Sequence, residues 1–230
     1  MPDLLDAIEI ETGPAPRAAV VWLHGLGADG HDFAPVVPEL RLPRTLPVRF
    51  VFPHAPRRPV TINNGMVMRA WYDIFDLEGG RGEDEAGIRA SQGHVETLLA
   101  RERTRGVPAA AIVLAGFSQG GAIALQTGLR HPEPLAGILG LSTYLPLGRT
   151  VAAEASAANR DVPIFMAHGL QDDLIPPARA RRARDRLHEM GYRVTWREYP
   201  MPHAVCREEI EDVGQWLRGV LGGQAGSTAS

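Results

Sequence analysis

The chain has 230 residues, of which 44% are hydrophobic and 22% charged, a composition ordinary for a soluble globular protein of one domain. Its formal net charge of -3 gives no reason to expect nucleic acid or an anionic membrane surface as the main partner. All 24 basic residues other than histidine are arginines, which excludes the lysine chemistry of Schiff bases, pyridoxal phosphate attachment and P-loops.

The first residues of the chain carry no visible targeting signal. Residues 1–6 are acidic and lack both a basic region and a long apolar core, so no signal peptide is expected. No apolar run approaches the roughly 20 residues that cross a bilayer. The single cysteine, Cys206, has no intrachain partner for a disulfide, which fits a reducing compartment. These features predict a cytoplasmic protein without integral membrane association.

The first third of the chain begins with strand patterns and ends in an irregular stretch. Continuous apolar runs predict buried strands over residues 18–23 and 48–52, and a short helix interrupted by prolines is expected between them, over residues 32–40. Residues 53–82 carry proline, asparagine, glycine and aromatic residues without a sustained period. They are expected to form a long irregular loop, and such loops are often functional.

From residue 84 onward, helix and strand patterns alternate. Helices are predicted over residues 84–105, 119–130, 178–190 and 208–221. Strands are predicted over residues 111–115, 135–141, 162–167 and 193–199. This alternation implies an α/β fold with a mostly parallel sheet and helices on both faces. No repeat or linker divides the chain, so we expect one domain over residues 1–221 and a disordered tail over residues 222–230.

The turn between the strand at 111–115 and the helix at 119–130 has the pattern Gly-x-Ser-x-Gly around Ser118. A strand that turns this sharply into a helix pushes its central side chain clear of the sheet, and Cβ atoms at Gly116 or Gly120 would collide with neighbouring backbone. The serine hydroxyl would then lie where unpaired amides can receive a developing negative charge. Short motifs of this kind recur by chance, so the turn alone does not decide between catalysis and a glycine-rich connection.

An acid and a base follow further along the chain, each in a loop after a predicted strand. A nucleophilic serine needs a base, and the base needs an acceptor that fixes its tautomer. The loop after residue 167 carries Asp172 and Asp173, and the loop after residue 199 carries His203. The order serine, acid, histidine is that of α/β-hydrolases. We favour Asp172 as the acid and Asp173 as a cap or loop residue; Glu198 is a weaker rival because it lies within a strand.

The other histidines are weaker candidates for the base. Several lie in or beside helical segments: His31, His94, His131 and His188. His54 precedes the serine strand, which gives the wrong order, whereas His24 and His168 each precede a glycine at a strand end and are expected to hold loops by hydrogen bonds. The histidines show no close His/Cys spacing of the kind that binds zinc, so no metal site is expected.

The first strand is followed by the glycine-rich loop 25–30, which reads literally as the dinucleotide fingerprint G-x-G-x-x-G. That fingerprint also needs an acidic residue at the end of the second strand, and this strand ends at Pro53 and His54 without one. In a hydrolase, the same loop supplies a backbone N–H to an oxyanion hole, beside the N–H of the residue after the nucleophile. The natural donors are Leu26 and Gln119. A dinucleotide-binding enzyme is the remote alternative.

Taken together, these motifs resemble the phospholipase/carboxylesterase group of α/β-hydrolases, which includes acyl-protein thioesterases and small bacterial carboxylesterases. The bacterial carboxylesterase branch is the most similar by these motifs. The matching stretches span nearly the whole chain: residues 23–30, 51–63, 71–74, 115–122, 168–176 and His203. The resemblance implies an α/β-hydrolase fold with Ser118 as nucleophile, Asp172 as acid and His203 as base. It also implies Leu26 and Gln119 as the oxyanion donors.

The resemblance extends to the acyl groove, where the family's equivalent of Trp71 and the loop before it contribute. The candidate groove residues are Trp71, Ile62, Met68, Leu141 and Tyr144. Their alternative role is to pack the loop onto the core. One departure from the family pattern is Pro202, which stands where relatives often carry a small residue and bears on the shape of the histidine loop.

The expected reaction is hydrolysis of short- to medium-chain carboxylic esters, and of acyl thioesters, through an acyl-enzyme on Ser118. No metal or organic cofactor is expected. Lysophospholipase or acyl-protein thioesterase activity is the alternative within this chemistry, and a catalytically silent hydrolase-fold binding protein is a remote one. The expected partner is a small acyl substrate. Dimers occur among relatives, so a homodimer is an expectation by analogy alone.

Overall fold

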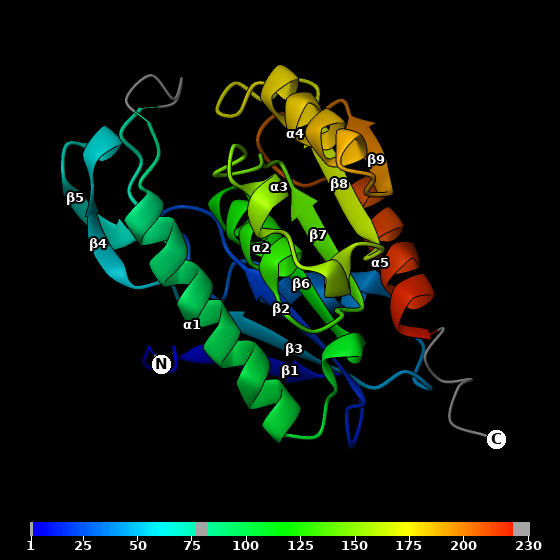
Figure 1. The fold of residues 1–230 in the computed structure, drawn as a ribbon. Helices are drawn as coiled ribbons and strands as arrows, with labels where there is room; N and C mark the ends of the chain where they lie inside the picture. The colour runs from blue at the N-terminus through cyan, green and yellow to red at the C-terminus, as the bar shows by residue number, and fades with distance from the viewer. Residues whose placement is uncertain (1, 77–81, 223–230) are drawn as a thin grey trace.

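A seven-stranded sheet in the order β1-β3-β2-β6-β7-β8-β9 forms the centre of this computed structural model, which describes residues 2–76 and 82–222 (Figure 1). Its strands are β1 (Ala7–Glu11), β2 (Ala18–Leu23), β3 (Val48–Pro53), β6 (Ile112–Phe117), β7 (Gly137–Leu141), β8 (Ile164–Gly169) and β9 (Val194–Tyr199). Strand β1 pairs antiparallel with β3, and every other neighbouring pair is parallel. The prediction of a mostly parallel sheet is confirmed.

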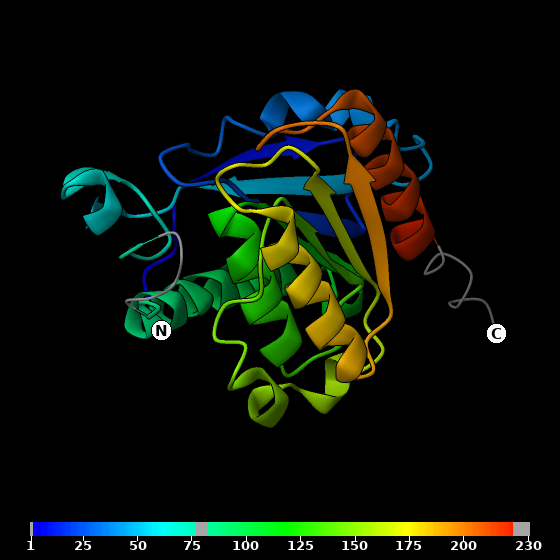
Figure 2. The same ribbon diagram turned by 90° about the horizontal axis from the view of Figure 1, so that it is seen from above.

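Helices cover both faces of this sheet. Those of the described residues are α1 (Glu85–Thr104), α2 (Gln119–Arg130), α3 (Val151–Glu154), α4 (Pro177–Glu189), α5 (Arg207–Gly222) and the short 3-10 helices η1 (Ala34–Leu40), η2 (Thr61–Asn63), η3 (Ala109–Ala111) and η4 (Ala157–Asn159). In Figure 2, α1, α2 and α4 lie on one side of the sheet, and η1 and α5 on the other. The predicted α/β architecture, with helices on both faces, is therefore observed.

Burial explains why the strands are so apolar. Strands β2, β3, β7 and β8 are buried at every position, because helices cover them on both faces. Strand β9 alternates between half-buried and exposed positions up to the buried Tyr199, as expected for a strand at the edge of the sheet. Helix α2 is buried along almost its whole length, since it packs on the sheet and against α1.

Several short elements were not predicted, the 3-10 helices η2, η3 and η4 among them. Another is strand β1, which forms an edge of the sheet. A further one is the antiparallel hairpin that β4 (Arg57–Val60) and β5 (Met66–Arg69) form inside the expected irregular loop. The hairpin lies apart from the sheet, beside the start of α1 (Figure 1). The one-turn helix α3 was also not predicted. The predicted tail at residues 222–230 lies outside the described residues except for Gly222, which ends α5.

Within residues 2–76 and 82–222, no helix is both long enough and apolar enough to cross a bilayer.

Candidate active site

Ser118 lies between β6 and α2 with φ 55° and ψ -120°, a strained conformation for a residue with a side chain. Two glycines make this conformation possible. A Cβ at Gly116 would overlap the backbone of Gly120, and a Cβ at Gly120 would overlap the carbonyl oxygens of Leu23 and His24 at the end of β2. We call residues 116–120 the serine turn. The strand-turn-helix geometry predicted from its sequence is present.

Ser118, His203 and Asp172 form one chain of hydrogen bonds. Ser118 Oγ lies 2.9 Å from His203 Nε2, and His203 Nδ1 lies 2.7 Å from Asp172 Oδ2. The three residues follow β6, β9 and β8, so their strands end at the same edge of the parallel sheet. Because a carboxylate oxygen accepts, Nδ1 donates its proton to Asp172 and leaves Nε2 free to accept from the serine hydroxyl. The ring of Phe117 lies 4.8 Å from the imidazole, centroid to centroid, and supports its orientation.

Asp172 is buried, and both of its carboxylate oxygens have partners. Oδ1 accepts from the amides of Leu174 at 3.0 Å and Ile175 at 2.8 Å. Oδ2 also lies 3.2 Å from His168 Nε2, which is 2.8 Å from the carbonyl oxygen of Ile175. Burial lowers the pKa of His168, so the neutral ring donates from Nε2. The neighbouring Asp173 is exposed, and the fold brings Asp172 to the histidine instead.

The loop after β2 carries a candidate backbone donor at Leu26. The amide of Leu26 makes no backbone hydrogen bond within the described residues. Gln119 begins α2, so its amide has no acceptor inside the helix. Buried His24 fixes this loop, since its Nδ1 lies 2.7 Å from the carbonyl oxygen of Gly25 and its Nε2 accepts from the amide of Ala55 at 3.0 Å. Burial lowers the pKa of His24 to about 4, which keeps the ring neutral for both roles.

The glycine-rich loop 25–30 lacks the surroundings of a dinucleotide fingerprint. In that fingerprint a helix begins at the loop, so that the helix N-terminus faces the pyrophosphate. Here the next helical element, η1, begins only at Ala34. The loop instead lines a cavity through Gly25, Leu26 and Ala28.

This cavity has a volume of about 530 Å³, and Ser118 and His203 lie in its wall. Apolar side chains dominate the rest of the lining: Leu26, Ile62, Ile74, Phe117, Leu174 and Ile175. A mostly apolar hollow with a few convergent polar groups is the usual form of a small-molecule site. The cavity can therefore hold an acyl chain with its carbonyl carbon near the Ser118 hydroxyl.

The five predicted groove residues separate into two groups. Ile62 and Tyr144 line the cavity. Met68, Trp71 and Leu141 are not among its lining residues. Trp71 and Leu141 are fully buried, and the indole N–H of Trp71 donates to the carbonyl oxygen of His24 at 2.9 Å. Met68 lies on β5 and is half-buried. Trp71 and Leu141 thus support the site from behind.

The side chain of Gln119 has a structural role that the motif did not predict. Its Oε1 accepts from the amide of Trp71 at 2.8 Å, and its Nε2 donates to the carbonyl oxygen of Tyr72 at 2.8 Å. The hydroxyl of Ser91 on α1 donates to the carbonyl oxygen of Trp71. These bonds attach the segment after β5 to the serine turn. The only sequence signal for them is a long polar side chain at a position that the fold buries.

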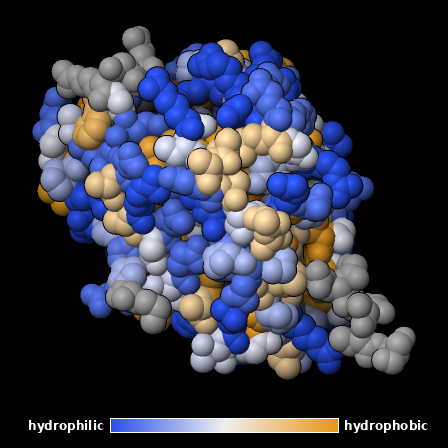
Figure 3. All heavy atoms as spheres, viewed as in Figure 1, coloured by the Kyte–Doolittle hydropathy of each residue, from blue (hydrophilic) through white to orange (hydrophobic). Residues whose placement is uncertain are grey.

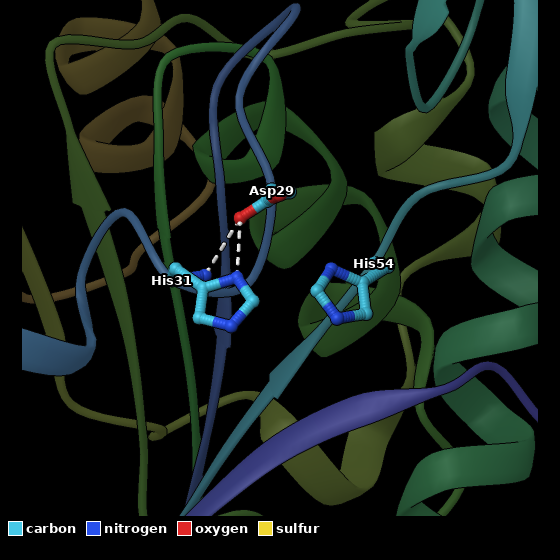
Figure 4. A group of neighbouring side chains, drawn as sticks. All are labelled: Asp29, His31 and His54. Carbon is cyan, nitrogen blue, oxygen red and sulfur yellow. Dashed lines mark hydrogen bonds and ion pairs between the residues drawn. The ribbon is translucent and has the colours of Figure 1, made fainter.

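Asp29, His31 and His54 come together, although their spacing did not indicate a metal site (Figure 4). Their ligand atoms lie within 4.8 Å of one another. Asp29 Oδ1 accepts from the amide of His31 at 2.9 Å and lies 3.0 Å from His31 Nδ1. His54 Nδ1 accepts from the amide of Gly30 at 3.0 Å, and burial lowers the pKa of this ring. These bonds connect the three side chains to the glycine-rich loop and shape it.

The chain matches known proteins along nearly its whole length. The model of the family described as Phospholipase/Carboxylesterase matches residues 6–221. Acyl-protein thioesterase 1 of Neurospora crassa is 44% identical over 209 residues, which are 87% of this chain and 85% of that protein. Among solved structures, acyl-protein thioesterase 2 of Zea mays has a TM-score of 0.81 at 30% identity, covering 94% of this chain and 100% of that one. SOBER1 of Arabidopsis thaliana has a TM-score of 0.84 at 28% identity, covering 89% and 99%.

Proposed function

The chain belongs to the phospholipase/carboxylesterase family of α/β-hydrolases and is a hydrolase, and from this premise we propose that Ser118, His203 and Asp172 are its catalytic triad. The observation that carries the proposal is the continuous hydrogen-bond chain from Ser118 Oγ through His203 to Asp172, at 2.9 and 2.7 Å. Both distances lie within the range over which a proton can be passed between nucleophile and base.

In the first half of the reaction, the acyl group passes to Ser118. His203 Nε2 takes the hydroxyl proton as Ser118 Oγ attacks the carbonyl carbon, and a tetrahedral oxyanion forms. The backbone amides of Leu26 and Gln119 donate to this oxyanion. Asp172 stabilises the imidazolium through Nδ1. The bond to the leaving oxygen or sulfur then breaks, and His203 gives its proton to the departing alcohol or thiol.

In the second half, water removes the acyl group. His203 takes a proton from water, the hydroxide attacks the acyl carbonyl, and a second oxyanion forms at the same two amides. Its collapse releases the carboxylic acid and returns the proton to Ser118. The side chains of this chain supply every proton transfer, and we propose that the reaction requires no metal or organic cofactor.

The proposed substrates are short- to medium-chain carboxylic esters and acyl thioesters. An apolar cavity of about 530 Å³ suits an acyl chain of this size, with Ile62 and Tyr144 among its walls. Acyl-protein thioesterase or lysophospholipase activity is the second candidate, and it is favoured by thioesterases among the relatives at 36–44% identity. These activities use the same acyl-enzyme and differ only in the leaving group.

The test of the triad is covalent labelling. A fluorophosphonate should label the wild-type chain once and fail to label a Ser118→Ala variant, whose kcat for p-nitrophenyl butyrate should fall by about 10⁴-fold or more. Labelling that persists in the variant would assign the nucleophile to another residue. The preferred acyl-chain length is measured with a series of p-nitrophenyl esters of rising chain length. An acyl thioester that carries one of these acyl chains is assayed beside them.

The remaining proposals concern the setting of the enzyme. We propose one folded domain over residues 1–221. The single Cys206 is in line with a cytoplasmic location. The net charge of -3 is in line with small acyl compounds, and not nucleic acid, as partners. A homodimer rests on analogy with the family. Light scattering coupled to size-exclusion chromatography would decide between monomer and dimer.

A further inference from the structure

A second hollow adjoins the catalytic cavity, with a volume of about 860 Å³. Its walls are the start of α1, the segment between β7 and α3, and one face of α4. Four arginine side chains line it: Arg149, Arg179, Arg182 and Arg186. In Figure 3, which faces the same way as Figure 1, the surface over α4 is mainly hydrophilic. We call this hollow the arginine groove.

Helix α4 keeps the arginines of the groove apart from its other arginines. Those that line the groove follow at intervals of three and four residues and so share one face of the helix: Arg179, Arg182 and Arg186. The others are engaged with β9 and with the helix itself. Arg181 Nε lies 2.7 Å from Glu198 Oε1, and the guanidinium of Arg184 lies 5.1 Å from the ring centroid of Trp196. The helix therefore has a structural arginine face and a groove face.

The groove arginines have few protein partners. Arg149 and Arg182 are exposed and form no hydrogen bond or ion pair with their side chains anywhere in the part of the chain that the structure describes. Arg186 pairs with Glu189 at 3.0 Å, and Glu189 is itself 65% exposed, so water weakens this pair. These three guanidinium groups are available to an anion.

Two carboxylates in the groove offset the positive charge only in part. Glu83 accepts from the amide of Leu147 at 3.0 Å, and burial raises the pKa of its carboxyl despite the nearby arginines. Glu85 lies 2.7 Å from Arg89 Nε. Four guanidinium groups thus share the hollow with two carboxylates that already have partners, so the groove attracts anions.

The groove and the catalytic cavity share a wall. Tyr144 and Arg179 line both hollows, and the Arg179 guanidinium lies 3.6 Å from the centroid of the Tyr144 ring. The Tyr144 hydroxyl is fixed in turn by the Tyr72 hydroxyl at 2.6 Å. An ester bound at Ser118 with its acyl chain in the apolar cavity can therefore extend its leaving group past this wall to the arginines.

We propose that the arginine groove binds a phosphate group in the leaving portion of the substrate, through Arg149, Arg182 and Arg186. The planar fork of a guanidinium matches two phosphate oxygens, and an arginine side chain stays charged in proteins. Leaving groups of this chemistry are the glycerophosphate head of a lysophospholipid and the phosphorylated thiol of a coenzyme A thioester. The inference rests on the proposed function, because the acyl group of such a substrate is cleaved at Ser118. Phosphate binding itself does not need Ser118.

The kinetic test compares phosphorylated and neutral substrates of one acyl chain. For octanoyl-coenzyme A and octanoyl lysophosphatidylcholine, kcat/KM is measured relative to p-nitrophenyl octanoate in wild type and in Arg149→Gln/Arg182→Gln. The ratio for at least one phosphorylated substrate should fall about tenfold, through KM. The substrate whose ratio falls identifies the leaving group. A ratio that is unchanged for both overturns the proposal.

A matched control is available on the same helix. Arg181→Gln/Arg184→Gln removes the same net charge from the other face of α4 and should retain the wild-type ratios. Equal losses in the groove variant and in this control would attribute the effect to net charge and would also overturn the proposal.

A binding measurement separates this inference from the proposed function. Calorimetric titration with inorganic pyrophosphate should show wild type binding about tenfold more tightly than Arg149→Gln/Arg182→Gln, with the difference reduced at high salt. Loss of ester hydrolysis with retained pyrophosphate binding would contradict only the catalytic assignment. Normal ester hydrolysis with equal pyrophosphate affinity in wild type, groove variant and control would contradict only the arginine groove.

Discussion

Asp172 serves two groups of partners with one carboxylate. Oδ2 accepts from His203 at 2.7 Å, while Oδ1 accepts from the amides of Leu174 and Ile175 and so fixes the loop after β8. An asparagine at this position could keep the second role with its oxygen, but its nitrogen would then face His203. The ring would be left in the wrong tautomer for taking a proton from Ser118.

We therefore predict that Asp172→Asn lowers kcat by about 10³- to 10⁴-fold while the protein remains folded. The measurement is ester hydrolysis beside a thermal melt. Asp173→Asn is the matched control and should stay within about twofold of wild type, because Asp173 is exposed and lies outside the hydrogen-bond chain. The reverse result would exchange the two aspartates in the assignment.

At the scale of elements, the serine turn depends on how closely β2 approaches α2. Gly120 lies so near the carbonyl oxygens of Leu23 and His24 that a Cβ would overlap both, and neither backbone group can move without displacing β2. A glycine elsewhere behaves differently. Gly219 is exposed on α5 with no atom near its Cβ position, so there a methyl group would only restrict the unfolded chain.

These two glycines give opposite predictions for the same substitution. Gly120→Ala should destabilise the fold by about 3 kcal/mol and reduce activity, as overpacking against backbone does. Gly219→Ala should stabilise α5 by about 0.5–1 kcal/mol, since glycine is a poor helix former. Urea denaturation of both variants gives the comparison. A tolerated Gly120→Ala would contradict the close approach of β2 and α2.

Gln119 joins two elements through its side chain, and this also can be tested. Gln119→Ala leaves the buried amide of Trp71 and the carbonyl of Tyr72 without their partners, at about 1–3 kcal/mol for each group. Tyr72 and Ile74, which follow Trp71 in the chain, line the cavity, so KM for esters should rise as well. Gln215, exposed on α5, is the control position, and Gln215→Ala should change stability by less than about 0.5 kcal/mol. Unchanged stability in Gln119→Ala would refute the link.

Elements whose pattern is long and continuous were predicted from the sequence, and short or non-local ones were not. Helix α2 was predicted over residues 119–130 and has these bounds, and the β2 run at residues 18–23 likewise agrees. The hairpin of β4 and β5 was missed because each strand has only four residues and Pro59 interrupts the first. Neither strand carries a pattern long enough to distinguish it from a loop.

At the scale of the whole molecule, the same limit applies to the site. Chain order and strand-end position suggested that Ser118, Asp172 and His203 would meet, and the three lie together in the fold, because parallel strands end at one edge. Which side chains would line the cavity depends on packing between distant segments. Trp71 and Leu141 are apolar and belong to segments that reach the site, yet the sheet and the loops bury them behind it.

One buried carboxyl links the stability of the whole molecule to pH. Glu209 lies in the first turn of α5 and is fully buried. Burial raises the pKa of its carboxyl to about 8, against the opposing effect of the Cys206 backbone. Between the ordinary value of 4.5 and about 8, the folded protein keeps a proton that the unfolded chain releases. The free energy of unfolding must therefore fall as pH rises through this window, and the loss is complete above pH 8.

We predict that Glu209→Gln removes this part of the pH dependence. Glutamine has no proton to lose, so the variant should gain stability over wild type at pH 9 and show little gain near pH 5. Each unit of pKa shift corresponds to about 1.4 kcal/mol, so the gain at pH 9 should amount to several kcal/mol, less the cost of burying the amide. Urea denaturation at both pH values measures this gain.

Glu211→Gln is the control, at an exposed site two residues further along α5. It should leave the difference in stability between the two pH values as in wild type. A Glu209→Gln variant that loses stability equally at pH 5 and pH 9 would show that the buried carboxyl does not titrate in this range, because only an ionising group can make its contribution depend on pH.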